Sequence, residues 1–321
     1  MSDPEASGDP AAAILGETPS LTAGEVAEQA GMRAEDARRL WRVLGFPELR
    51  DEAAYTSSDV EALRAVVGIL GDGIVDLDML FQIARGVGLT MGRLADWEVG
   101  ALIQHIANDD TLEVGAATPL LLEKYGRTFE ELLLYSWRRH LAAALTRMES
   151  LRSVDDEDPQ STDLTVGFAD IVGFTALSNE LTRERIGDLV EVFEARSGDV
   201  IGTNHGRLIK SMGDAVLFVN DDPFAAFETA EGIINVIGRD SRMPDVRVGL
   251  ASGPVVMRLG DVFGPAVNLA ARLTQVARRN RIIVDQTTAG LLPAEQIECR
   301  PLPPRPVRGF GIVEPVAARR V

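Results

Sequence analysis

Cysteine, histidine and positive charge are scarce in this sequence of 321 residues. A single cysteine, Cys299, excludes an intrachain disulfide and any metal site built from several thiolates. Lysine and arginine number 32 against 49 aspartate and glutamate residues, which gives a formal net charge of −17. A surface this acidic repels nucleic acid and anionic lipid unless a local basic patch overrides it. An anionic substrate would need a cationic pocket or a bound metal.

Long hydrophobic runs are also missing. No uncharged run reaches the ~18 residues that a membrane span needs. The acidic start MSDPEASGDPAAAILGE lacks the basic and apolar regions of a secretory signal. We therefore expect a cytoplasmic protein without a membrane span. The composition, 45% hydrophobic and 25% charged, is that of a globular protein, and the length suits two domains.

The first half of the chain carries helical patterns. Residues 1–20, rich in small residues, proline and acids, predict a flexible tail. Residues 21–150 predict an all-helical domain that begins with the capping-box pair Thr22 and Glu25. The start of this domain resembles a helix-turn-helix of the MerR kind.

The role of this helical half is left open by the sequence. Ser57 or Ser58 is expected to cap its third helix. DNA binding is disfavoured because Glu35 and Asp36 stand among the arginines of the candidate recognition helix. A regulatory helical bundle with an unknown ligand is the favoured interpretation. Its last helix has an apolar face that fits a core, a dimer seam or a ligand pocket, formed by Leu132, Leu133, Leu134, Trp137 and Leu141.

The second half alternates between strands and helices. The acidic, proline-containing stretch 151–162 predicts a linker, and the alternating pattern fills residues 163–321. The run LTVGFADIV predicts a strand and IKSMGDAVLFV a hairpin, with amphipathic helices between and after them. The order βαββαβ predicts an α+β, ferredoxin-like layer of sheet and helices.

Two aspartates stand at strand ends in apolar surroundings. Asp170 ends the first strand and Asp214 lies at the hairpin turn. Two converging carboxylates repel each other, and a divalent metal is the usual remedy. Gly173 begins a short helix after Asp170, whose free N–H groups would suit a phosphate. Asp170 as an ordinary helix N-cap is the alternative.

Four further polar residues interrupt apolar segments of the second half. Lys210 lies in the hairpin and Asp261 comes just before a helix. Asn268 and Arg272, four apart on one face of that helix, interrupt an apolar pattern in which an asparagine is locally unfavourable. A solvated helix face is the ordinary interpretation of such a pair, but functional sites produce inconsistencies of this kind.

Three segments together resemble a known family. FADIVGFT, IKSMGDAVLFV and DVFGPAVNLAAR, in this order, are similar to motifs of the class III nucleotidyl cyclase catalytic domain. The resemblance covers about residues 160–321. It implies two metal ions, Mg²⁺ or Mn²⁺, in each active site, held by Asp170, Asp214 and the backbone carbonyl of Ile171. It also implies a head-to-tail homodimer with sites at the interface.

The resemblance assigns the remaining candidates to ATP. Lys210 and Asp261 fall where adenylate cyclases bind the adenine, whereas guanylate cyclases have other residue types there. Asn268 and Arg272 match residues that orient the ribose and stabilise the transferring phosphoryl group. Substrate contacts are further expected from Phe174, Thr175 and Arg308, the last at a position where many members have lysine.

The sequence thus predicts an adenylate cyclase regulated by its helical half. A guanylate cyclase is the alternative within the same chemistry. A nucleotide sensor without turnover, or a transcription regulator with a DNA-binding helical half, is the alternative from another class. The three histidines, at positions 105, 140 and 205, lie outside the motifs, so no imidazole is an obvious general base.

Overall fold

The chain folds into two compact units, Met1–Arg147 and Met148–Val321, and each is described by itself. The computed structural model describes residues 10–47, 52–107, 114–151, 161–258 and 260–321. Within these ranges, no helix is both long enough and apolar enough to cross a membrane.

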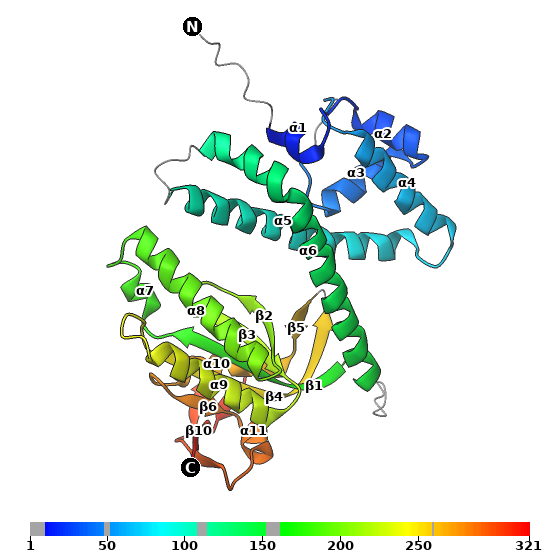
Figure 1. Ribbon diagram of the computed structural model, residues 1–321. Coiled ribbons are helices and arrows are strands. Elements are labelled where there is room, and N and C mark those ends of the chain that lie inside the picture. Colours follow the sequence, from blue (N-terminus) through cyan, green and yellow to red (C-terminus); the bar gives the residue numbers. More distant parts are fainter. Residues whose placement is uncertain (1–9, 48–51, 108–113, 152–160, 259) are drawn as a thin grey trace. The chain divides into compact units, whose positions relative to one another are not determined.

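The first unit is helical in the residues described, as predicted (Figure 1). Its helices are α1 (Pro10–Leu15), α2 (Ala23–Ala30), α3 (Ala34–Val43), α4 (Ser57–Gly71), α5 (Leu77–Ala107) and α6 (Val114–Leu151). Helix α1 lies inside the predicted tail, of which residues 1–9 are outside the described ranges. Helix α5 runs without a break over 31 residues.

Local signals explain where the first helices begin. The predicted capping box of α2 is confirmed: the Thr22 amide donates to the Glu25 carboxylate at 2.8 Å. The prediction that Ser57 or Ser58 caps α4 is wrong. The N-cap is Thr56, whose amide donates to Asp59 at 2.8 Å, so that Thr56 and Asp59 form a capping box.

Helices α2, α3, α4 and the start of α5 share one core. Val26, Leu40, Trp41, Leu63 and Phe81 are buried in it. Helix α5 approaches the end of α3 closely at a glycine: a Cβ on Gly88 would lie 2.4 Å from the carbonyl oxygen of Leu44. The first part of α5 is thus fixed against the core.

The second unit is built on a mixed sheet. Its strands are β1 (Ser161–Ile171), β2 (Arg207–Ser211), β3 (Ala215–Asn220), β4 (Val246–Arg258), β5 (Asp261–Phe263), β6 (Ile282–Val284), β7 (Ile297–Pro301), β8 (Arg305–Val307), β9 (Gly311–Val313) and β10 (Val316–Arg320). The order β2-β3-β1-β4 with antiparallel neighbours is the predicted ferredoxin-like arrangement. Strands β6, β10 and β7 extend the sheet beyond β4.

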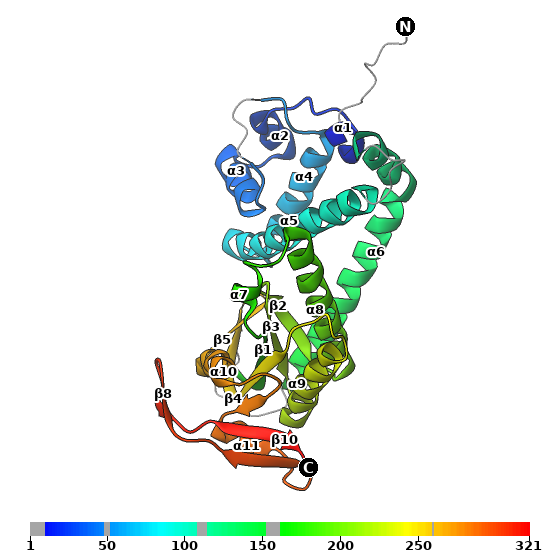
Figure 2. The ribbon, with the colours of Figure 1, turned by 90° about the vertical axis from the view of Figure 1, so that its left-hand side faces the viewer.

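Helices cover both faces of this sheet (Figure 2). Its helices are α7 (Phe174–Leu177), α8 (Arg183–Thr203), α9 (Pro223–Gly238), α10 (Pro265–Val276) and α11 (Gln286–Leu291). Helices α8 and α9 pack on one face around Phe193 and Phe227, and α10 packs on the other. A Cβ on Gly249 would lie 2.4 Å from the amide nitrogen of Thr274, so this glycine lets α10 lie directly on β4.

Candidate functional site

The predicted metal-binding segments lie side by side at one end of the sheet. Asp170 pairs with Ala215 in the antiparallel ladder of β1 and β3, which puts Asp214 beside it at the hairpin turn. The Ile171 amide donates to the Asp214 carbonyl at 2.9 Å. Asp170 belongs to β1, and the N-cap of α7 is Gly173 with φ 75°, so Asp170 is no helix cap.

Burial makes the Asp170 carboxylate expensive to ionise. Its side chain is 16% exposed, and desolvation, reinforced by the charge of Asp214, raises its pKa above the usual value. Hydrogen bonding and charge from Arg247 oppose this shift: its Nη2 and Nε donate to one Asp170 oxygen at 2.5 and 2.7 Å. Two converging carboxylates with one compensating cation fit the chemistry of a divalent metal site.

Arg247 is a site residue that the sequence analysis missed. It stands at the second position of β4 and lies opposite Asp170 in the ladder of β1 and β4. Its one signal in the sequence is a charge near the start of a strand whose next four residues are apolar or glycine. Among the described residues, no cluster of three or more histidine, cysteine or acidic side chains could hold a metal. The candidate metal ligands that the structure brings together are therefore the two carboxylates of Asp170 and Asp214.

Phe174 and Thr175 form the first turn of α7, directly after this site. The Phe174 side chain is half-buried and packs against the core under α8 and α9. Thr175 is exposed, and its carbonyl accepts a hydrogen bond from Asn179 at 3.0 Å. The structure thus holds this turn beside Asp170 through β1.

Lys210 and Asp261, 51 residues apart in sequence, form an ion pair. The Lys210 Nζ donates to Asp261 Oδ2 at 2.5 Å, with side chains 36% and 30% exposed. Desolvation raises the pKa of Asp261, but the ammonium of Lys210 and the Val262 amide outweigh it, so the pKa lies below its usual range. The contact of Lys210 is with Asp261 on β5, although Asp214 is nearer in sequence.

Asn268 and Arg272 project from α10 away from its packed face. Ala266, Ala270 and Leu273 of that helix are buried against the sheet, whereas Asn268 is exposed and Arg272 half-buried. Arg272 donates to the side chain of Gln275 at 3.2 Å. Two polar groups are thus held on the open side of a rigid helix.

Arg308 lies in the turn between β8 and β9. Its side chain is exposed, and Gly309 follows it with φ 88°. A positive φ at this residue favours glycine. The two strands on either side fix the turn through the register of Arg305 with Val313.

Arg247 and Asp261 lie toward opposite ends of β4. Arg247, the partner of Asp170, is near its start, whereas Asp261 pairs in register with Arg258 at its end. Arg258 stands 11 positions after Arg247, which corresponds to about 36 Å of extended strand at about 3.3 Å per residue. Lys210 lies opposite Leu217, which pairs with Phe168, so its backbone is only two residues along the sheet from Asp170, while its side chain contacts Asp261 on β5.

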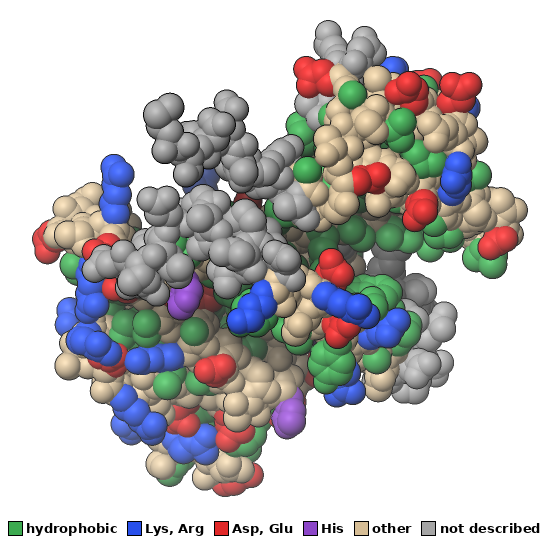
Figure 3. All heavy atoms as spheres, turned by 45° about the horizontal axis from the view of Figure 1, so that its top comes forward, with side chains coloured by type: hydrophobic (Ala, Val, Ile, Leu, Met, Phe, Trp, Pro, Cys, Tyr) green, Lys and Arg blue, Asp and Glu red, His purple; other side chains and the backbone are tan. Residues whose placement is uncertain are grey.

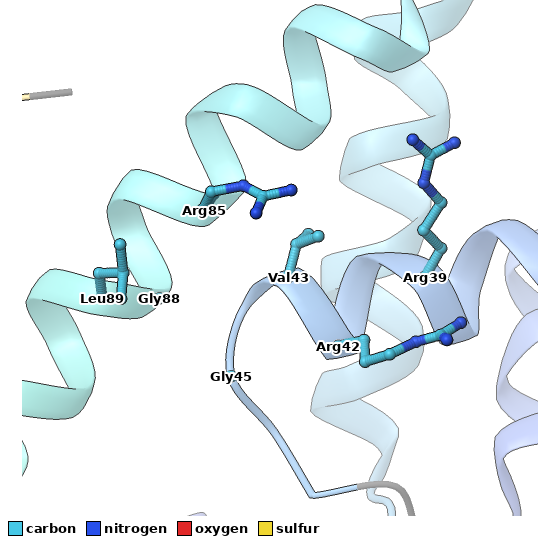
Figure 4. Close-up of a pocket in the computed structure, with 7 residues that line it drawn as sticks. All are labelled: Arg39, Arg42, Val43, Gly45, Arg85, Gly88 and Leu89. Atoms are coloured by element: carbon cyan, nitrogen blue, oxygen red, sulfur yellow. The ribbon is translucent and has the colours of Figure 1, made fainter. Parts of the chain in front are cut away.

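A pocket of about 600 Å³ lies between α3 and α5 of the helical unit. It is lined by Arg39, Arg42, Val43, Gly45, Arg85, Gly88 and Leu89 (Figure 4). The guanidinium of Arg39 stacks over Phe81 at 4.2 Å, and Arg85 reaches from α5 toward α3. None of the three sequence motifs contributes to this lining.

Comparisons with known proteins agree with the resemblance. Residues 157–316 match the family model of the adenylate and guanylate cyclase catalytic domain. An adenylate cyclase of Streptomyces coelicolor is 36% identical over 94% of this chain and 86% of its own length. An adenylate cyclase of Streptomyces griseus is 34% identical over 96% and 88%. The solved structure of the adenylyl cyclase CyaB from P. aeruginosa, 24% identical, covers 50% of this chain and 95% of its own, with a TM-score of 0.47.

Proposed function

This chain belongs to the family of adenylate and guanylate cyclase catalytic domains, and we propose that it converts ATP to 3′,5′-cyclic AMP and pyrophosphate. The observation that carries the choice of base is the Lys210–Asp261 ion pair. An ammonium donates to adenine N1, and a carboxylate accepts from the exocyclic amine. Guanine carries a proton at N1 and a carbonyl in place of that amine, so the pair favours ATP.

The site residues would act mainly by positioning. Asp170, Asp214 and the carbonyl of Ile171 would hold two Mg²⁺ or Mn²⁺ ions, which acidify the ribose 3′-hydroxyl and neutralise phosphate charge when bound. Asn268 orients the ribose so that its 3′-oxygen lies in line with the α-phosphorus.

The phosphates would be bound by backbone and guanidinium groups. Arg272 stabilises charge on the transferring phosphoryl group. The backbone of Phe174 and Thr175 binds phosphate oxygens, and Arg308 binds the triphosphate through its planar fork.

Two copies of the chain would complete each site. Lys210 contacts Asp261 on β5 rather than Asp214 of its own hairpin, which supports a site that takes Asp170 and Asp214 from one copy and Lys210 and Asp261 from another. Two catalytic units arranged head to tail would then form two equivalent sites.

The helical unit is proposed as the regulator of this activity. The helical unit precedes the catalytic unit in the chain, and the last residue of its helix α6 is ten positions before β1. A nucleic-acid partner is disfavoured, because Arg33 at the start of α3 pairs with Glu35 and Asp36 at 3.3 and 3.4 Å. The first turn of that helix thus presents acids where a helix-turn-helix contacts DNA.

Purified full-length protein given ATP and Mn²⁺ should produce cyclic AMP and pyrophosphate in equal amounts. Chelation of the metal should stop the reaction, because the two carboxylates and the phosphates are all negatively charged and repel each other without a bound cation. The products are measured by chromatography, with GTP as the parallel substrate. Turnover of GTP at or above that of ATP would overturn the base assignment, and no product from either nucleotide would overturn the function.

Replacing Arg247 should make the stability of the metal-free protein more sensitive to pH. Arg247→Met leaves Asp170 without its cation, which we expect to cost about 1–2 kcal/mol at pH 8, less than for a fully buried pair. The pKa of Asp170 is already raised, and this change raises it further. A carboxyl whose pKa is raised in the folded state makes the folded protein less stable as pH rises through that pKa. The loss of stability caused by Arg247→Met should therefore shrink toward pH 5.

The measurement is urea unfolding of the full chain from pH 5 to pH 8, with chelator and with Mn²⁺. Mn²⁺ should restore part of the loss, since it neutralises the same carboxylate. Arg242→Met, which removes an exposed arginine bound to Asp240, is the matched control. A loss that is equal at every pH and unaffected by Mn²⁺ would show that Arg247 does not compensate Asp170.

A further inference from the structure

The pocket between α3 and α5 is cationic, although the chain has a formal net charge of −17. Three of the residues that line it are arginines, at positions 39, 42 and 85, and none of the described lining residues is acidic. On the face drawn in Figure 3, by contrast, basic and acidic side chains lie among one another. The positive charge of this pocket is therefore local, and it attracts an anion that an acidic surface repels.

Two helices bring the three guanidinium groups to one pocket. Arg39 and Arg42 are three residues apart on α3, which places them on the same face of that helix. Arg85 reaches toward them from α5 (Figure 4). The spacing of the two helices is set by the glycine contact described above, where Gly88 lies against the backbone of Leu44. The arrangement of the arginines thus depends on packed helices.

Two of these arginines have no acidic partner within the described ranges. Arg39 lies 4.0 Å from a carboxylate oxygen of Asp78 and stacks over Phe81. Arg42 and Arg85 form no ion pair with any described residue, and both are exposed. Like charges that share one pocket repel each other, and a bound anion relieves that repulsion. The unpaired arginines are therefore the groups available to a ligand.

The size and the lining of the pocket indicate the class of anion. A volume of about 600 Å³ is in the ordinary range for sites that bind small organic molecules. A guanidinium matches a phosphate with two parallel hydrogen bonds, and a phosphate monoester carries about −1.5 to −2 charges at neutral pH, enough for two arginines. A carboxylate carries only one charge. Val43 and Leu89 add apolar surface for an uncharged part of the ligand.

We propose that the helical unit binds a small phosphate monoester in this pocket. The phosphate lies between Arg42 and Arg85, and the apolar part of the ligand packs against Val43 and Leu89. The site is separate from the three sequence motifs, none of which lines the pocket. The proposal rests on the pocket alone and does not depend on the proposed cyclase activity.

Phenyl phosphate tests this site, because it combines one phosphate with one apolar ring. Titration calorimetry of the full-length chain, at low salt and with a chelator, should give a Kd of about 1 mM or below. Arg42→Met with Arg85→Met should weaken this binding at least about tenfold, because charge-assisted hydrogen bonds to the phosphate are lost. Arg38→Met with Arg93→Met is the matched control. It removes two exposed arginines from the same two helices outside the pocket lining and should leave binding unchanged.

Two further probes examine the parts of the ligand separately on the unmodified chain. Benzoate, with one charge, should bind at least about fivefold more weakly than phenyl phosphate. Inorganic phosphate lacks the ring and should also bind more weakly, because the apolar contact is missing.

Three results would overturn the proposal. They are no binding of phenyl phosphate up to about 10 mM, equal binding by the two double variants, and binding of benzoate as tight as that of phenyl phosphate. The last result would make the pocket a carboxylate site. Cyclic AMP formation by the unmodified chain is measured separately, so a failed phosphate site and a failed cyclase are distinguishable.

Discussion

An equal mixture of Asp214→Ala and Lys210→Ala proteins should regain about a quarter of the unmodified activity, although each protein alone is inactive. Random pairing makes about half of the dimers mixed. One of the two sites in a mixed dimer receives both damaged residues, and the other receives two intact ones. We expect each single variant to lose at least about 10³-fold in kcat, because a metal ligand or a base contact is missing from both sites.

The pairing of variants supplies its own control. Asp170→Ala mixed with Asp214→Ala should stay inactive, since both changes damage the same half of every site. The proteins are co-expressed with different tags and assayed for cyclic AMP as the random mixture; purification through both tags isolates the mixed dimers, whose activity should be about half that of the unmodified protein. No recovery in the mixed Asp214 and Lys210 dimer would overturn the shared site. Recovery of activity in the mixed dimer of Asp170→Ala and Asp214→Ala would overturn the proposal that both aspartates come from the same chain in each active site.

The sheet of the catalytic unit was predictable where the pattern is strong. The run ending at Asp170 and the hairpin around Asp214 form β1, β2 and β3 as predicted. The extension by β7 and β10 was not predicted, because these strands are short and alternate weakly: β10 reads VAARR. The capping of α4 was readable in principle, since Thr56 and Asp59 have capping-box spacing.

The sequence predicted which residues belong to the candidate site, but it did not predict which of them contact one another. Similarity to a family placed Lys210 and Asp261 in one site, and the ion pair between them required β2 and β5 to meet. Arg247 has no such signal, because its importance depends on the register that sets it opposite Asp170. Pairings across strands are properties of the folded sheet, and a single arginine at a strand start resembles an ordinary exposed residue.

Removing Asp261 should remove the preference for the exocyclic amine of adenine. We expect Asp261→Ala to lower kcat/KM for ATP about 10²–10³-fold, because a site built to hydrogen-bond a group depends strongly on that bond. Purine riboside triphosphate lacks this amine and should react with the unmodified enzyme about as poorly as ATP reacts with the variant. With the variant, the two nucleotides should react nearly equally, since the partner of the amine is already gone.

The base contact of Lys210 predicts the corresponding result with a different analogue. Lys210→Met should abolish the difference between ATP and 1-deaza-ATP, which lacks the N1 acceptor, while the difference caused by the amine persists in part. Glu298→Ala, which breaks an exposed ion pair with Arg319 in the same unit, should leave both preferences unchanged. Fully additive losses from residue and analogue would mean that neither side chain contacts the base. In that case the Lys210–Asp261 pair would hold β2 to β5 and the choice between ATP and GTP would lie with other residues.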